Sequence, residues 1–236
     1  MLAALGKSAI GDAAVLIGSS GLFGFETVVP ALTEDIDVAI PEALAAESGS
    51  EIVSALALAG FRHEAGTATF TDDLGTTFDL LGHGDPARGD HIGGGGPLRI
   101  MIFEDLSRVV GVGRAVAALP GGGSALTPAG FVVTKLLTER GHKGLKDKLQ
   151  ALLVIAEHSA DSVFSAEVVR LLSSVDPIRV DDALASAQDA FLGLGQNPAF
   201  ADAGAEGYVS SLPEVERGFV QLGELVLALD HQGGPR

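Results

Sequence analysis

The sequence predicts an α+β protein in which a mixed sheet with flanking helices is followed by a C-terminal helical domain. Two observations lead to this prediction. Up to residue 126, short apolar runs alternate with glycine-rich turns, a pattern typical of strands. After Thr127-Pro128, apolar residues recur at helical spacing over longer segments. We therefore expect two domains, residues 1–126 and residues 127–236.

In the first half, strands are recognised as short apolar runs that end at glycine, serine or proline. Gly18-Ser19-Ser20 ends the first run, and a serine there can cap a short helix. The turns at residues 72–75 and 120–123 are each expected to close a hairpin, and residues 82–97 to form a glycine-rich loop. The expected elements are strands at 14–17, 36–40, 67–71, 76–81 and 98–103, and a helix at 42–60 that Gly60 ends.

The second half begins with a helix start signal. Thr127 is a good N-cap residue, and Pro128 suits the first helical position. Apolar residues at helical spacing then predict one helix after another, without an internal repeat or coiled-coil heptads. The expected helices are residues 127–140, 145–157, 166–173, 180–194 and 214–229.

The composition narrows the class of protein. Hydrophobic residues make up 47% of the 236, which is enough for a globular core. The sequence has no cysteine, which excludes disulfides, thiol catalysis and Cys-based zinc sites and is consistent with the cytoplasm. The apolar N-terminus, residues 1–17, lacks the basic region of a signal peptide, and no stretch approaches a membrane span. We therefore expect a cytoplasmic protein that does not associate with a membrane.

The formal net charge of −16 bears on the partners. Such a surface repels nucleic acid phosphates unless the basic residues gather in one patch. It favours a cationic substrate or metal ions, although solubility alone is the commoner reason for an acidic composition.

Asp35 and Asp37 are the first candidate metal ligands. In a strand, alternate side chains point the same way, so the two carboxylates share a face while Ile36 faces the core. At about 6–7 Å apart along the strand, they can share hard cations, which prefer oxygen ligands. Without a cation the pairing of two like charges is electrostatically unfavourable.

Gly18, Ser19 and Asp79 complete the candidate site. Gly18 allows the backbone to approach a phosphate closely, and Ser19 supplies a hydroxyl. Asp79 lies within an apolar strand, where an unpaired charge is costly. A bound metal ion would offset that cost.

Together these residues resemble a known family. Gly18-Ser19, Thr33-x-Asp35-x-Asp37 and Asp79 in an apolar strand are similar to the motif of the DNA polymerase beta-like nucleotidyltransferase superfamily. The resemblance implies the nucleotidyltransferase fold, with the Gly-Ser pair holding a nucleoside triphosphate (NTP). It implies two Mg²⁺ ions on Asp35 and Asp37, which Asp79 joins as third ligand or base. The reaction implied is Mg²⁺-dependent in-line transfer of a nucleoside monophosphate to an acceptor.

The start of the helical half adds a second match. Pro128-x-x-Phe131-x-x-x-Lys135-Leu136-Leu137, followed by Arg140 and Lys146-Asp147, resembles the helical segment of abortive-infection toxin nucleotidyltransferases, the toxins of type IV toxin–antitoxin pairs. By this resemblance Lys135 contacts the triphosphate, Lys146 lies nearby and Asp147 orients the basic groups. The likeness covers about residues 14–155, and the tail beyond it matches no family that we recognise.

Two departures from the family pattern keep a second function open. Ala31 stands where many relatives have an arginine, and residues 22–32 contain no basic side chain to meet a triphosphate. The alternative is a non-catalytic nucleotide-binding or interaction module of a toxin–antitoxin-type pair, with a cognate antitoxin as its partner. For an enzyme, the acceptor is RNA, a protein or a small molecule. The toxin-like helical segment favours an RNA or protein acceptor. The net charge argues against RNA and mildly favours a cationic small molecule.

Several polar residues also have plainer interpretations. Lys135 could be a solvent-facing lysine, and Asp147 could pair with Lys143 at helical spacing. The polar residues of the glycine-rich loop match no standard metal site, so a mobile substrate-binding loop is expected there. These residues are His83, Asp85, Asp90 and His91. The basic cluster could be a solvated helix end or could bind an anion; it consists of Arg140, His142, Lys143, Lys146 and Lys148.

Overall fold

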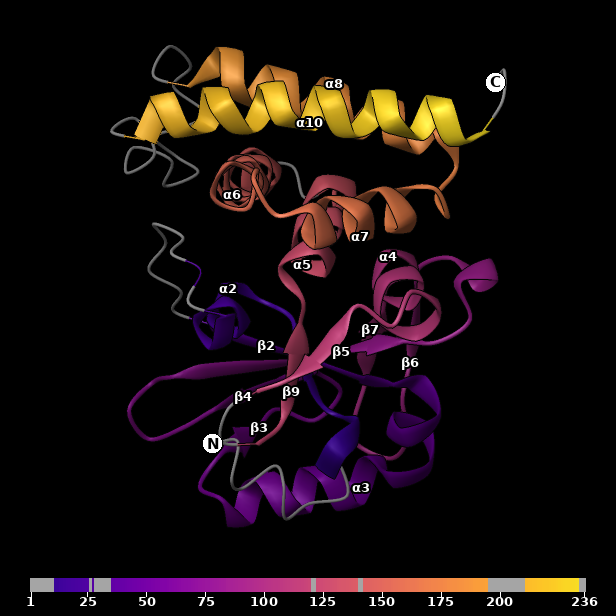
Figure 1. Cartoon of the computed structure of the whole chain (residues 1–236). Helices are drawn as coiled ribbons and strands as arrows, with labels where there is room; N and C mark the ends of the chain where they lie inside the picture. Colours follow the sequence, from indigo (N-terminus) through magenta and orange to yellow (C-terminus); the bar gives the residue numbers. More distant parts are fainter. Residues whose placement is uncertain are drawn as a thin grey trace. The chain divides into compact units, whose positions relative to one another are not determined.

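The computed structural model describes residues 11–25, 27, 35–119, 122–139, 142–194 and 211–233 (Figure 1). Contacts divide these residues into two compact units, which we treat separately. The first unit holds the described residues up to Phe25 and from Asp35 to Thr127, and the second holds Thr27 and those from Pro128 onward.

The first unit is built on a mixed, open sheet with the strand order β3-β4-β5-β2-β1-β9-β8. The central strands β2 and β5 are parallel, β1 runs antiparallel to β2 and parallel to β9, and β6 and β7 extend the sheet beside β5. The expectation of an α+β protein with a mixed sheet is confirmed. The strands are β1 Val15–Leu16, β2 Asp35–Pro41, β3 Arg62–His63, β4 Thr69–Thr71, β5 Thr77–His83, β6 His91–Gly93, β7 Ile100–Ile102, β8 Val116–Ala118 and β9 Ser124–Leu126.

The two faces of this sheet differ because side chains alternate along each strand. From Thr77 to His83 of β5, part-exposed and buried residues alternate without exception. The buried set packs against helix α3 (Glu42–Leu58), which lies along one face of the sheet (Figure 1). This core includes Val38, Ile40, Ile52, Leu56, Phe70, Phe78 and Leu80. The opposite face carries the residues between them, which include Asp37 of β2 and Thr77 and Asp79 of β5.

Short helical segments connect the strands. They are the 3-10 segments η1 (Gly11–Ala13), η2 (Phe23–Phe25) and η3 (Pro86–Arg88), helices α2 (Ser19–Leu22) and α4 (Glu104–Leu106), and a π-helical segment, Ser107–Val112. The sequence did not predict the last two. Their buried Ser107 accepts a hydrogen bond from the Gly84 N–H and donates one to the Phe103 carbonyl. These bonds attach the segment to the end of β5.

The expectation of a structureless loop at residues 82–97 is wrong in part. β5 continues to His83, and His91–Gly93 forms strand β6 against β7. The three residues of β6 carry no apolar alternation that would mark them in the sequence. Their strand conformation comes from pairing with β7. The hairpin expected around residues 72–75 is confirmed, because β4 and β5 pair antiparallel across it.

The second unit is helical. Its helices are α5 Pro128–Leu137, α6 His142–Glu157, α7 Ser162–Leu172, α8 Pro177–Gly193 and α10 Leu212–Gly233. Helices α7 and α8 begin earlier than the apolar spacing predicts, because Asp161 and Asp176 cap their first turns with side-chain hydrogen bonds. Helix α5 ends at Leu137, short of the expected residue 140. Among the helices of the described residues, none is both long and apolar enough to cross a membrane.

Candidate functional site

Gly18 lies against Asp37 at the end of β1. The N–H of Ile17 donates to the Asp37 carbonyl at 3.1 Å, which fixes the end of β1 beside β2. A Cβ atom placed on Gly18 would come within 2.8 Å of Asp37 Oδ2. A side chain at this position would therefore displace the carboxylate of Asp37. Ser19, the other member of the predicted pair, opens helix α2 directly after it.

Asp37 and Asp79 are neighbours across the two central strands. Strands β2 and β5 are parallel and in register, with Asp37 opposite Asp79. Paired positions on adjacent strands lie about 4.8 Å apart and share a face. Buried residues on either side, Val38 and Leu80, point into the core, so both carboxylates project from the opposite, polar face. The sheet thus brings two acids together from separate parts of the sequence.

Thr69 holds Asp79 in place. Its hydroxyl donates to Asp79 Oδ1 at 2.5 Å, and the β4–β5 ladder sets the two residues opposite each other. The sequence interpretation missed Thr69. The signal was present in the hairpin, because antiparallel pairing across the turn at residues 72–75 brings residues 69 and 79 together.

Asp35 opens β2, with its backbone in register with Thr77. Its side chain lies outside the described part of the structure, as do Thr33 and Ala31. Among the side chains that are described, no group of three His, Asp or Glu residues could hold a metal ion. Asp37 and Asp79 supply carboxylate oxygens, the ligands that Mg²⁺ prefers, and their side-by-side arrangement fits a divalent cation.

Lys135 and Asp147 form an ion pair within the second unit. Lys135 Nζ donates to Asp147 Oδ1, which joins α5 to α6, and the two side chains are 17% and 8% exposed. The Lys135 ammonium also lies 5.6 Å from the centre of the Phe131 ring. The alternative that Lys135 is solvent-facing is therefore wrong. Asp147 bonds to Lys135, and the side chain of Lys143, its alternative partner, lies outside the described residues.

Part of the basic cluster predicted from the sequence is buried inside the second unit. Lys148 is 3% exposed, and its Nζ donates to the carbonyls of Lys135 and Thr138 at 3.0 and 2.8 Å. It satisfies carbonyls at the C-terminal end of α5, which have no partner within the helix. Lys146, one turn into α6, is half-buried. The side chains of Arg140, His142 and Lys143 lie outside the described residues.

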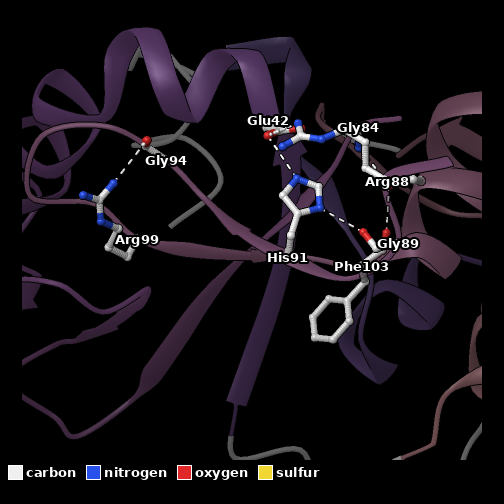
Figure 2. A network of polar contacts seen from close by, with 9 residues as sticks. Glu42, Gly84, Arg88, Gly89, His91, Gly94, Arg99 and Phe103 are labelled. Atoms are coloured by element: carbon white, nitrogen blue, oxygen red, sulfur yellow. Dashed lines mark hydrogen bonds and ion pairs between the residues drawn. The ribbon is translucent and has the colours of Figure 1, made fainter. Parts of the chain in front are cut away.

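A second polar network lies at the other end of β2 and β5. Figure 2 shows His91 between Glu42, which opens α3, and the Gly89 carbonyl. The two ring nitrogens lie 3.1 Å from Glu42 Oε1 and 2.9 Å from the Gly89 oxygen. Arg88 donates to the same Glu42 oxygen at 2.7 Å. These contacts attach the glycine-rich segment to α3, which the sequence did not predict.

The protonation of His91 follows from its two partners. A carbonyl and an ionised carboxylate can only accept, so each hydrogen bond needs a protonated ring nitrogen. Hydrogen bonds to Gly89 and then to Glu42 raise the pKa of His91 above its ordinary 6.5. The bond from His91, with help from Arg88, lowers the pKa of Glu42 below 4.5. Burial lowers the pKa of the nearby His83 below 6.5.

The other polar residues of this segment act locally. Asp85 caps η3 through the Ala87 N–H, and Asp90 Oδ1 accepts from the Glu104 N–H at 2.7 Å. Arg99 donates to the Gly94 carbonyl at 3.5 Å (Figure 2). The mobile substrate loop expected at residues 82–97 is thus a segment held by hydrogen bonds from its own side chains and from α3.

The comparisons with known proteins assign no family. No protein-family model matches the sequence, and no curated protein matches it significantly.

Proposed function

We propose that the first unit has the nucleotidyltransferase fold and transfers a nucleoside monophosphate from an NTP to an acceptor, in a reaction that depends on Mg²⁺. The observation that carries the proposal is the pairing of Asp37 with Asp79, in register on parallel strands and with Gly18 against Asp37. Two carboxylates side by side repel each other, and a divalent cation bound by both would offset that repulsion. We therefore expect Asp37 and Asp79, with Gly18 beside them, to bind a triphosphate together with its metal ion.

Each residue of the site has a proposed role in the reaction. Asp35, Asp37 and Asp79 would hold Mg²⁺, which when bound stabilises charge on the attacking and leaving oxygens. A hydroxyl oxygen of the acceptor forms a bond to the α-phosphorus, and the bond from that phosphorus to the pyrophosphate oxygen breaks. Asp79 takes the proton from the hydroxyl, and the pyrophosphate leaves as the anion. Gly18 lets the backbone approach the triphosphate, and Ser19 offers it a hydroxyl.

In the second unit, we propose that Lys135 and Lys146 bind the triphosphate. The ion pair with Asp147 fixes the rotamer of Lys135, so less conformational entropy is lost when an anion binds. Lys146 precedes Asp147 in α6 and, like Lys135, is half-buried. The toxin-like segment thus supplies two cations.

The test is incubation with each α-³²P-labelled NTP, Mg²⁺ and a mixture of cellular RNA, proteins and small molecules. The control is Asp37→Asn with Asp79→Asn, which keeps the size of both side chains and removes both charges. We expect label on one class of acceptor with the wild type and at least a hundredfold less with the variant.

Equal labelling by the double variant would refute the assigned acids. If the wild type transfers no label but binds an NTP in the presence of Mg²⁺, the protein is the non-catalytic nucleotide-binding module instead. In either case circular dichroism spectra of the two proteins must coincide, because the comparison requires that the variant is folded.

A further inference from the structure

A hollow of about 510 Å³ lies over β3, β4 and the turn between them. Its volume falls in the range of small-molecule sites, about 300–1,000 Å³. It is lined by Arg62, His63, Glu64, Thr67, Thr69 and Thr71. The lining residues are thus three threonines, a histidine and one residue of each charge.

Thr69 belongs both to this hollow and to the acid pair. Its hydroxyl lines the hollow and donates to Asp79 Oδ1 at 2.5 Å. Asp79 in turn stands in register with Asp37. A molecule in the hollow therefore lies one side chain away from the proposed base.

The hydrogen bonds of the lining threonines limit what can bind. The Thr69 hydroxyl proton is committed to Asp79, and the Thr67 hydroxyl donates to the Glu64 carbonyl at 2.8 Å. Their oxygens can therefore only accept a hydrogen bond from a ligand. A hydroxyl or an ammonium group can supply that bond, whereas an ionised phosphodiester such as the RNA backbone, which has only acceptors, cannot.

The charges of the hollow lead to the same conclusion. Arg62 forms an ion pair with Asp73 at 3.2 Å, and Glu64 contributes a carboxylate. An RNA strand is bound through several uncompensated lysines or arginines. In the described residues of this hollow, the single arginine is already balanced by an acid.

We infer that this hollow binds the acceptor, and that the acceptor is a small molecule with several hydroxyl or amino groups. The inference rests on the proposed function, and it selects one of the acceptor classes that the sequence leaves open. Thr69 is then a positioning residue. It orients Asp79 through its proton and accepts a hydrogen bond from the acceptor through its oxygen.

The first experiment measures binding without turnover. ¹⁵N-labelled protein is titrated with glucose, glucosamine and myo-inositol, and separately with dimethyl phosphate, an acceptor-only phosphodiester, at the same concentrations. We expect saturable amide shifts within residues 62–71 for at least one hydroxylated probe and none there for dimethyl phosphate. Dimethyl phosphate binding in this segment, or no saturable shift with any of the three hydroxylated probes, would overturn the inference.

Variants at Thr69 separate recognition from folding. Thr69→Val keeps the shape and removes the hydroxyl, so the Kd of the bound probe should rise about tenfold, the effect of one hydrogen bond. Thr69→Ser should restore it to within about twofold. Thr138→Val in the second unit, which loses a comparable hydroxyl bond to the Thr134 carbonyl, should leave it unchanged. Equal affinity of Thr69→Val and wild type would overturn the assignment of Thr69.

The binding and transfer experiments can fail separately. If labelled NTP is transferred and the probes do not bind, the proposed function stands and the hollow is not the acceptor site. If the probes bind as expected and no transfer occurs, the hollow is a small-molecule site and the nucleotidyl transfer is refuted. With an active enzyme, Thr69→Val should raise the KM for the acceptor while the affinity for Mg²⁺–NTP stays within about twofold.

Discussion

Gly18 and Asp37 are packed so closely that a side chain on Gly18 would displace the Asp37 carboxylate from its observed position. The nearest atom to an added Cβ is a carboxylate oxygen of Asp37, at 2.8 Å. Gly18, which we propose contacts the phosphates, therefore also limits the position of Asp37, which we propose binds the metal ion.

Gly18→Ala should displace the Asp37 carboxylate and weaken divalent cation binding. We expect the Kd for Mn²⁺, measured by electron paramagnetic resonance, to rise about tenfold, or ~1.4 kcal/mol. Gly223→Ala in α10 is the matched control, because among the described residues nothing lies within 4 Å of a Cβ added there. Unchanged Mn²⁺ affinity in a folded Gly18→Ala variant would show that Asp37 is not a ligand.

The Lys135–Asp147 pair should behave as a buried salt bridge. Removing one partner leaves the other charge unpaired, so Asp147→Asn should lower the free energy of unfolding by about 3 kcal/mol. The double variant Lys135→Met with Asp147→Leu should recover most of that loss, because no charge is left buried. Urea unfolding of the three proteins measures both values.

The same variants separate the structural role of Lys135 from its role toward a ligand. If Lys135 binds the triphosphate, the stable double variant should still bind Mg²⁺–NTP at least tenfold more weakly than the wild type. Wild-type affinity in the double variant would restrict Lys135 to folding. In that case Lys146→Met becomes the test of the second proposed cation.

The His91–Glu42 contact predicts how stability depends on pH. The folded-state pKa of His91 is raised, so its contribution is complete below about 6.5 and is lost as the pH rises through the folded value. The pKa of Glu42 is lowered, so its contribution is present above 4.5 and is lost as the pH falls through the folded value. The network should therefore stabilise most between these limits.

His91→Gln should accordingly lower Tm more at pH 5.5 than at pH 8.5. The difference between wild type and variant is the useful quantity, because burial of His83 acts with the opposite sign and is common to both proteins. Arg88 also bonds to Glu42 and remains in the variant. An equal loss of Tm at both pH values would contradict an imidazolium at position 91.

Replacing either of two glycines of α10 by alanine should change the free energy of unfolding, but in opposite directions for the two positions. A Cβ on Gly218 would lie 1.9 Å from the carbonyl oxygen of Leu152 in α6, so Gly218→Ala should destabilise the helical unit by about 1–3 kcal/mol. Gly223→Ala meets nothing in the described structure and should stabilise by about 0.5–1 kcal/mol through backbone entropy. Thermal unfolding of both variants tests the close packing of α10 on α6, and stabilisation by Gly218→Ala would refute it.

Much of the fold could be predicted because its signals are local. The alternation of β5, the stop of α3 before Gly60 and the start of α5 at Pro128 each follow from a few adjacent residues. The hairpin at residues 72–75 is similarly local, since Asp72 Oδ1 accepts from the N–H groups of Leu74 and Thr76 within the turn. The candidate acids were located in strands for the same reason.

By itself the sequence determined the order of the longer strands and helices and placed Asp37 and Asp79 within strands. The tertiary structure alone decided that these strands are neighbours in register, that Thr69 bonds to Asp79, and that Lys148 is buried under the end of α5. Strand pairing and helix packing join residues that are distant along the chain, and hydrophobic periodicity fixes only which face a residue occupies. Which residue it contacts on that face depends on how all the strands and helices of the unit pack together.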